Sequence, residues 1–404
     1  MRLFLLIMFL ILQRGSGSVE VVRDLCANEW RLEVVGEGKS RLMVRPAQAP
    51  GEWVAANVPG LIVDRWTGVG TAEDGFIWLV REGRSYRFDP RHPEKGLAEG
   101  LRRPERIPGQ GAWKVVARMA ESNHDLTGAV VGGKLYIGGG LTADWGFPAR
   151  SHPFDTLQVF DPRAREGWAV AAKLHRERIY CATAAFDGRV WVIGGDYIEP
   201  DGSRYAVRTV EVYDPRTGRL ERGPEPELAR PMPLALEAGG RLYVMGNGRG
   251  EYDRPGRMES LGRGETKWRP EPEGPAGMGP LAGAALDGRL YVVVPGKGLA
   301  VFDARSSKWE VIDSPAAPRS CQMAAWKGEI WMMGGRDITN LAETRIYNPR
   351  TRSWRMGPEL PIPLSWGAAG VVDGRLYVTG GAAERAPDDR TWIYNDRTFR
   401  LEME

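Results

Sequence analysis

Short runs of β-branched and aromatic residues, most of them ending at glycine, recur along most of the chain. One run is GKLYIGGG, from Gly133 to Gly140. Its echoes are GRVWVIGG (188–195), GRLYVMG (240–246), GRLYVVV (288–294), GEIWMMGG (328–335) and GRLYVTGG (374–381), with a weaker copy DGFIWLV at 74–80. Residues that favour strands, bounded by Gly, Asp and Pro, predict short β-strands at a spacing of roughly 40 to 55 residues.

Each glycine-ended run belongs to a larger unit of four predicted strands. A run of small apolar residues such as CATAAF or LAGAAL precedes it. A polar loop follows, then a strand that ends in an aromatic residue and Asp-Pro, as at Tyr213-Asp214-Pro215, then a large side chain such as Trp354. Units of four strands that cannot bury both faces alone are stabilised by packing face to face around an axis. The pattern therefore predicts an all-β chain with a β-propeller.

The paired glycines, the Tyr and Asp-Pro step and the following Trp resemble the kelch repeat. The resemblance covers residues 61–404 and implies a kelch-type β-propeller of seven four-stranded blades, with six as the alternative. The unit at 72–116 lacks the glycine pair, so the count depends on it. Residues 19–60 contain strand-like segments, EWRLEVV and RLMV, without a complete unit, and we expect a strand-rich lead segment there.

The N-terminus predicts export. Residues 1–18 read MRLFLLIMFLILQRGSGS: Arg2, an apolar run from Leu3 to Leu12, then small and polar residues. The run is shorter than the roughly 20 residues of a membrane span and suits a secretory signal peptide. We expect a secreted or periplasmic protein without stable membrane insertion after cleavage, with an uncleaved anchor as the alternative.

Charge and cysteine content restrict the partners. The formal net charge is +3 with both signs mixed, so no basic stripe indicates nucleic-acid binding. Cys181 and Cys321 stand at equivalent places in units that face each other across the axis, too far apart for a disulfide, and we expect small buried residues there. The four histidines show no ligand spacing with a third ligand nearby. We predict no metal, no cofactor and a monomer.

The glycine clusters could suggest a phosphate-binding loop. Such a loop needs a strand that feeds a helix, whose N-terminal amides face the anion. After Gly140 the sequence predicts loop and strand, so the glycines are expected to be structural.

Topology indicates where a site would lie. In a four-stranded meander, the loop into the first strand and the loop between the second and third strands meet at one mouth of the axis, where sites gather. Guanidinium groups bind carboxylates and aromatic rings stack on sugar rings, so arginine and aromatic residues at this mouth could bind an acidic ligand. The alternative is that the arginines have a structural role and connect neighbouring blades. The candidate ligand-binding residues are His124, Asp125, Arg178, Tyr180, Arg230, Arg249, Glu251, Arg319, Arg336 and Trp366; no catalytic residue is assigned.

The favoured function is an exported module that binds a protein, a peptide or an acidic glycan at this mouth, without catalysis. The alternative is a carbohydrate-active enzyme, by resemblance to exported kelch proteins that epimerise N-acetylneuraminate. A copper oxidase of the galactose oxidase type ranks third, because the two His, two Tyr and Cys that it needs cannot be assembled.

Overall fold

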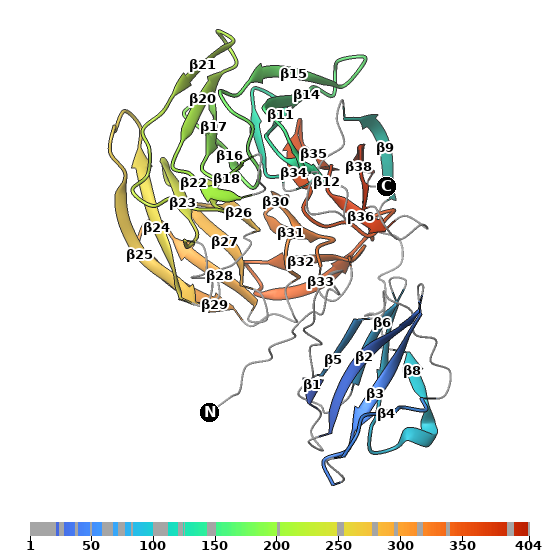
Figure 1. Ribbon diagram of the computed structural model, residues 1–404. Helices are drawn as coiled ribbons and strands as arrows, with labels where there is room; N and C mark the ends of the chain where they lie inside the picture. Colours follow the sequence, from blue (N-terminus) through green and yellow to red (C-terminus); the bar gives the residue numbers. More distant parts are fainter. Residues whose placement is uncertain are drawn as a thin grey trace. The chain divides into compact units, whose positions relative to one another are not determined.

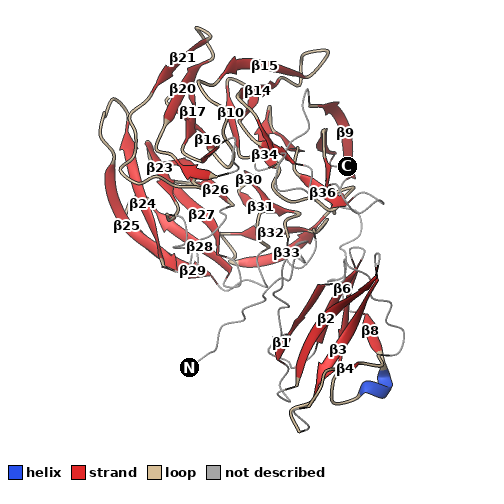
Figure 2. Cartoon of the chain, viewed as in Figure 1, coloured by secondary structure: helices blue, strands red, loops and turns tan. Residues whose placement is uncertain are grey.

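The structure is a computed structural model of the 404-residue chain. It describes residues 22–23, 28–36, 39–48, 51–58, 68–71, 77–81, 84–99, 112–119, 124, 126–143, 151–199, 203–248, 254–276, 282–294, 298–312, 318–336, 340–385 and 392–402. Strands dominate these segments (Figure 2). The chain divides into two compact units, Met1–Pro104 and Glu105–Glu404.

The second unit contains six four-stranded antiparallel sheets in its described residues, arranged as blades around an axis (Figure 1). Their strands, grouped by blade from the first to the sixth, are β10 (Gly128–Val131), β11 (Lys134–Gly138), β14 (Thr156–Phe160) and β15 (Trp168–Lys173); β16 (Ala182–Phe186), β17 (Arg189–Ile193), β20 (Val210–Asp214) and β21 (Arg219–Arg222); β22 (Leu234–Ala238), β23 (Arg241–Met245), β24 (Pro255–Gly262) and β25 (Arg269–Ala276); β26 (Gly283–Leu286), β27 (Arg289–Val294), β28 (Gly298–Asp303) and β29 (Lys308–Ile312); β30 (Gln322–Trp326), β31 (Glu329–Met333), β32 (Thr344–Asn348) and β33 (Ser353–Gly357); and β34 (Ala368–Val372), β35 (Arg375–Thr379), β38 (Arg397–Glu402) and β9 (Ala112–Arg118).

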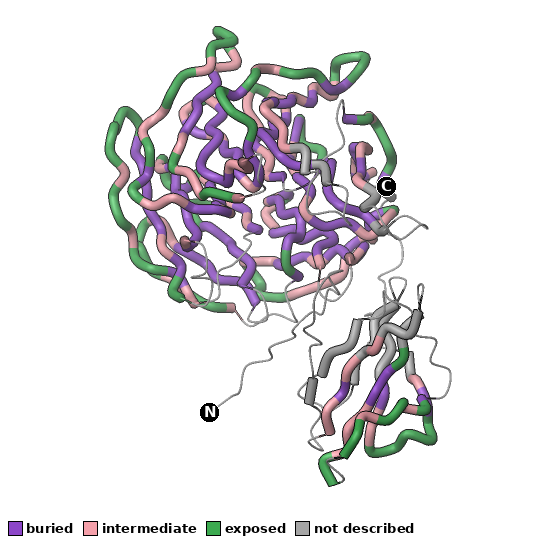
Figure 3. The backbone as a smooth tube through the Cα atoms, viewed as in Figure 1, coloured by how far each residue is buried: buried purple, intermediate pink, exposed green. Residues whose placement is uncertain are grey.

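The first strands of successive blades are neighbours around a closed ring, in which β34 also meets β10. Small residues allow this convergence. A Cβ at Gly128 would lie 2.9 Å from Leu135 Cδ1, and one at Gly370 would lie equally close to the same atom, so a side chain at either position would displace the buried Leu135. The second strands are buried, as Val190 and Ile193 show with no exposed side-chain surface. The core consists of separate apolar clusters, such as those between the fourth and fifth and between the fifth and sixth blades, and exposure is concentrated on the outer strands (Figure 3).

The ring is closed by a strand from the start of the second unit. β9 pairs antiparallel with β38, from Arg397 opposite Arg118 to Glu402 opposite Ala112. The sixth blade is therefore assembled from both ends of the unit.

Tryptophans of the fourth strands bind the preceding blade. Trp268 Nε1 donates to the carbonyl of Pro224 at 2.8 Å, and Trp309 Nε1 donates to that of Pro272 at 3.1 Å. Trp113 in β9 repeats the bond to Pro358 at 3.1 Å. These three indole N–H groups therefore bond neighbouring blades, whereas the buried Nε1 of Trp354 in the fifth blade has no acceptor among the described residues.

The first unit contains two further four-stranded antiparallel sheets. One is β1 (Val22–Arg23), β2 (Glu29–Gly36), β3 (Lys39–Arg45) and β4 (Val54–Ala55), and the other is β5 (Gly68–Thr71), β6 (Ile77–Arg81), β7 (Arg84–Phe88) and β8 (Leu97–Glu99). The rings of Trp30 in β2 and Phe88 in β7 meet edge to face, with centroids 5.7 Å apart. A short 3-10 helix, η1 (Pro93–Lys95), precedes β8.

The fold agrees with the predicted kelch-type propeller, and the blade number is the lower of the two predicted counts. The sequence pattern places a domain boundary after residue 60 and a blade at 72–116, whereas the structure divides the chain after Pro104. The strands of that unit up to Glu99 form a sheet of the first unit, and β9 completes the sixth blade. The ring closes without the 68–99 sheet because β9 fills the outer position beside β38.

Residues 1–21, which include the predicted signal peptide at 1–18, lie outside the described residues. No helix among the described residues is long and apolar enough to cross a membrane.

Closure of the ring makes Phe399 a sensitive position. Phe399 in β38 is fully buried, and Val115, its register partner in β9, is 52% exposed. We expect Phe399→Ala to lower the free energy of unfolding by about 3–5 kcal/mol, through lost burial and the cavity left behind. The control, Val115→Ala, should change it by less than about 0.5 kcal/mol. Urea denaturation of the full chain measures both, and equal effects would contradict the assigned closure.

Candidate binding site at the axial mouth

Glycine pairs follow the second strands and seat the segment that leads into the same blade. Gly195 has φ of 89°, and a Cβ added to it would lie 2.4 Å from the carbonyl oxygen of Ile179. Gly381 has φ of 93°, and its Cβ would lie 2.5 Å from the carbonyl oxygen of Ser365. Only glycine fits such contacts in this left-handed backbone. The pairs are therefore structural, as the sequence predicts, and they hold the lead-in turns, defined here as the two residues before each first strand.

The seated lead-in turns are themselves left-handed at non-glycine residues. Tyr180, Ser320 and Trp366, each two residues before a first strand, have φ of 57°, 54° and 55°. This backbone is unfavourable for L-residues and is found where the surroundings over-determine it. β-bridges between Ile179 and Asp196, and between Ser365 and Ala382, fix the residues beside two of these turns.

A depression lies at the mouth of the axis where the lead-in turns converge; we call it the axial mouth. It is lined by the lead-in turns of five blades, Leu126 and Thr127, Tyr180 and Cys181, Met232 and Pro233, Ser320 and Cys321, and Trp366 and Gly367. All of these lining side chains are uncharged. The largest side chains are those of Tyr180, Met232 and Trp366, which favours neutral, apolar ligand groups.

Both thiols are buried, as the sequence predicts, and are unbridged. Burial raises the pKa of Cys321 to about 12, so this thiol is neutral at physiological pH. Cys181 Sγ donates to the carbonyl of Gly138 at 3.2 Å.

An aromatic cluster stands on one side of the axial mouth. The His124 ring stacks on Tyr394, with centroids 4.8 Å apart and planes at 21°, and lies 6.0 Å from the Trp366 ring. The guanidinium of Arg336 lies 5.7 Å from the Trp366 centroid, within the range of a cation–π contact. This cluster joins residues of the first, fifth and sixth blades.

Two-stranded ribbons rise beside the lead-in turns of three consecutive blades. They are β12 (Leu141–Ala143) with β13 (Ser151–Pro153), β18 (Asp196–Ile198) with β19 (Arg204–Ala206), and β36 (Ala382–Arg385) with β37 (Trp392–Tyr394). Each is inserted between the second and third strands of its blade (Figure 1). Tyr394 of β37 brings the sixth-blade ribbon onto His124 of the first blade.

Arg178, predicted as a ligand-binding candidate, is buried instead. Its side chain has no exposed surface and forms an ion pair with the buried carboxylate of Glu211 in β20. Arg178 Nη1 donates to the carbonyl of Thr209 at 3.1 Å, while its own carbonyl accepts the N–H of Gly140 at 3.1 Å. Burial lowers the pKa of Arg178. This arginine connects the first and second blades.

Arg230 repeats the arrangement one blade further on. Its side chain is 2% exposed, and Nη1 lies 2.7 Å from Glu259 Oε2 in β24. Nε donates to the carbonyl of Gly246 at 3.0 Å, and the Arg230 carbonyl accepts the N–H of Gly195 at 3.0 Å. Burial lowers the pKa of Arg230, and Glu259 opposes that shift. The blade-connecting interpretation thus holds for both arginines.

The sixth blade has an apolar version of the same connection. Leu364 accepts the N–H of Gly335 through its carbonyl, as Arg178 and Arg230 accept those of Gly140 and Gly195. Thr379 at the end of β35 pairs with Thr398 in β38, and Phe399 comes next. Ile193 at the end of β17 likewise pairs with Val210 in β20, and Glu211 comes next. Phe399 therefore occupies the position in the sixth blade that Glu211 occupies in the second. Leu364 and Phe399 are both fully buried in one apolar cluster.

The structure brings together four of the candidates, His124, Tyr180, Arg336 and Trp366, around the axial mouth. Arg319 is exposed and forms a β-bridge with Arg336. Asp125, Arg249 and Glu251 lie outside the described residues. No three His, Cys, Asp or Glu side chains gather as metal ligands among the described residues.

Met232, Ser320 and Tyr394 were missing from the candidates. Met232 and Ser320 stand two residues before β22 and β30, as Tyr180 stands before β16. Alignment of the repeats on the first strand could therefore have found them. Tyr394 carries no such signal, because it reaches His124 from the ribbon of another blade.

Comparison with known proteins indicates the same architecture. No family model matches the chain. Kelch-like protein 25 of Xenopus tropicalis is 21% identical over 259 residues, 61% of this chain and 43% of that protein. Kelch repeat and BTB domain-containing protein 12 of Danio rerio is 29% identical over 244 residues, 55% of this chain and 32% of that protein. The chain thus matches less than half the length of either relative. A solved structure, "Structure of YjhT", has a TM-score of 0.57 at 14% identity and covers 70% of this chain and 96% of that one.

The buried ion pairs give a test of the blade connections. We expect Arg230→Leu to lower the free energy of unfolding by about 3–5 kcal/mol, because Glu259 is left buried without its guanidinium. Arg230→Leu with Glu259→Phe, which copies Leu364 and Phe399 of the sixth blade, should recover most of that loss. Urea denaturation measures both, and an Arg230→Leu variant as stable as the parent would contradict the connecting role.

Proposed function

Because residues 112–402 of this chain form a kelch-repeat β-propeller, we propose that the propeller is a binding module that recognises a protein or peptide partner at the axial mouth. The observation that carries this proposal is the pair of aromatic residues, Tyr180 and Trp366, held in left-handed turns that line the depression. The seating of these turns fixes both rings at a concave surface, where binding residues often lie.

The lining defines the group that enters. With Tyr180, Met232 and Trp366 around it and uncharged side chains at its base, the depression suits a bulky apolar or aromatic side chain of the partner. Tyr and Trp provide large contact area at low conformational cost, and methionine adapts its shape. Arg178 and Arg230 do not contribute positive charge to an incoming ligand, because each is buried against a glutamate.

The proposed module is exported. Support comes from the apolar run between Leu3 and Leu12, preceded by Arg2 and followed by small and polar residues, which has the composition of a signal peptide.

Peptide selection on the full chain tests the site. Random peptides displayed on phage should yield binders that carry an aromatic or large aliphatic anchor. Trp366→Asn and Tyr180→Asn remove the rings while Asn tolerates the left-handed backbone, and each should weaken binding of the selected peptides at least tenfold, as expected for anchor contacts. Tyr205→Ala, at an exposed tyrosine outside the depression, is the matched control and should bind as the parent does. Selected peptides that bind all three variants equally would place recognition elsewhere.

A second candidate function is isomerisation of an acidic sugar such as N-acetylneuraminate. It is supported by Arg336 over the Trp366 ring and by exposed Arg319 bridged to it, an arrangement that could hold a carboxylate beside an aromatic face. The same groups would bind an acidic glycan without catalysis.

Anomeric exchange of N-acetylneuraminate, followed by NMR, separates these possibilities. An isomerase would accelerate exchange, and Arg319→Ala with Arg336→Ala would abolish the acceleration without lowering the melting temperature. Exchange at the uncatalysed rate would rule out the isomerase, and the absence of any sugar response at millimolar concentration would also rule out the glycan ligand.

A further inference from the structure

A second groove lies at the opposite end of the first strands, away from the axial mouth. It spans the hairpin turns between the first and second strands of the first three blades. Its lining includes the apolar side chains of Val130, Val131 and Ala185, called the floor here, and the polar side chains of Asp187, Glu237 and Arg263, called the rim. None of these residues takes part in the axial mouth.

A missing side chain at Gly132, which lines the groove together with Asp187, leaves space there. In all six blades, the hairpin turn between the first and second strands begins with a residue whose φ lies between 47° and 59°. These residues are Gly132, Asp187, Gly239, Asp287, Lys327 and Asp373. Aspartate thus occupies this backbone conformation in three blades of the same molecule. A Cβ added to Gly132 would meet no atom within 4 Å, and one added to Gly239 would meet only Ala304 Cβ, at 3.4 Å. Packing therefore excludes a side chain at neither glycine, and Asp187, Asp287, Lys327 and Asp373 adopt the same backbone conformation in other blades. Of the two glycines, Gly132 lines the groove and keeps the space beside Asp187 open.

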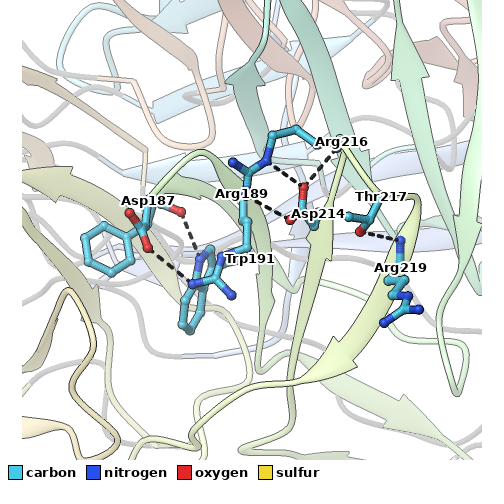
Figure 4. Close-up of polar contacts among 8 residues, drawn as sticks. Asp187, Arg189, Trp191, Asp214, Arg216, Thr217 and Arg219 are labelled. Carbon is cyan, nitrogen blue, oxygen red and sulfur yellow. Dashed lines mark hydrogen bonds and ion pairs between the residues drawn. The ribbon is translucent and has the colours of Figure 1, made fainter.

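The guanidinium of Arg263 shows how the carboxylate of Asp187 on the rim binds a cation. Arg263 Nε of the third blade lies 2.8 Å from Asp187 Oδ1 of the second, yet the Arg263 side chain is 76% exposed. Arg189 lies on the other side of the carboxylate, with Nη2 3.3 Å from Oδ2 (Figure 4). Ion pairs as exposed as that of Arg263 contribute little, so an incoming cation can displace it.

The rim and the floor together match one side chain. Once Arg263 is displaced, Asp187 Oδ1 faces the groove, and the exposed carboxylate of Glu237 stands on the same rim, accepting the N–H of Gly240 at 2.9 Å. Val130, Val131 and Ala185 supply an apolar surface for an aliphatic stem. A planar guanidinium on a three-carbon stem satisfies both requirements, because it pairs with carboxylates through several donors while its stem covers apolar surface.

We propose that this groove is a second binding site, which takes an arginine side chain of a partner peptide in the place that Arg263 occupies in the free protein. The site is independent of the proposed axial-mouth function, because the two share no lining residue.

Titration calorimetry of the full chain with N-acetyl-Leu-Arg-Leu-amide at low ionic strength tests the proposal. The arginine peptide should bind, and the peptide with citrulline in place of arginine, which is neutral and nearly isosteric, should bind at least tenfold more weakly. Equal affinity of the two peptides, or no binding of the arginine peptide at millimolar concentration, would overturn the proposal.

Variants locate the binding and separate it from general attraction to the acidic turns. Gly132→Asn fills the groove with a neutral residue that tolerates the left-handed backbone, and Asp187→Asn removes the carboxylate; each should weaken binding at least tenfold. Arg263→Ala should strengthen it about two- to fivefold, because the competing exposed ion pair is lost. A purely structural role for Arg263 would produce no such gain, and unchanged or weaker binding would count against the displacement.

Asp287→Asn changes the equivalent turn of the fourth blade and is the matched control. It should bind as the parent does, whereas a loss equal to that of Asp187→Asn would reduce the effect to nonspecific attraction and overturn the site. Trp366→Asn should also bind the arginine peptide normally. Failure at the groove is thereby distinguishable from failure at the axial mouth, which the phage-selected peptides report.

Discussion

The pairing of β9 with β38 is the interaction on which the rest of the propeller depends. Five blades are built from consecutive sequence, but the sixth takes its outer strand from residues 112–118, nearly 280 residues before its partner, with Arg118 opposite Arg397. Such a long-range contact is costly to form in chain entropy and must be repaid by burial, which Phe399 and Leu401 provide on the β38 side. The completed sixth blade in turn packs against the first through an apolar cluster that joins Leu135 and Trp168 to Tyr377, and this contact closes the ring around the axis.

Ring closure explains why glycine recurs where it does. First strands that converge on an axis bring each lead-in turn against the end of its own second strand, and Gly195 and Gly381 occupy that contact. This contact also determines which residues line the axial mouth. The seated turns take a left-handed backbone and line the axial mouth with the residue that stands there, Tyr180 in one blade and Trp366 in another. The repeat thus fixes where a side chain is presented, and the individual blade chooses which one.

The sequence predicts the propeller and the position of its mouth because the strand pattern is local and repeated in every blade. It does not predict whether a given arginine is buried or exposed, because that depends on contacts distant in the sequence. Arg178 and Arg230 stand in the lead-in segments where the repeat places them, but their glutamate partners lie in the third strands, 33 and 29 residues further along. Only the strand register shows that those carboxylates face the arginines. The sequence left the blade number open between seven and six for a similar reason: β9 carries strand-like sequence in either assignment, and its partner is decided by the closed ring. The contact between Tyr394 and His124 likewise depends on which blades are neighbours.

The same connection between blades occurs in two chemical forms, and the comparison shows what each form contributes. At Arg178 and Arg230, each buried charge is paired with a carboxylate and donates to at least one backbone carbonyl. At Leu364 and Phe399, apolar packing fills the corresponding positions. A buried ion pair is often no more stabilising than apolar residues of similar volume, but it is intolerant of a wrong partner. Charged connections between the early blades and an apolar one at the closing blade would therefore disfavour a ring that closes out of register, since a shifted blade would leave Glu211 or Glu259 buried without its guanidinium.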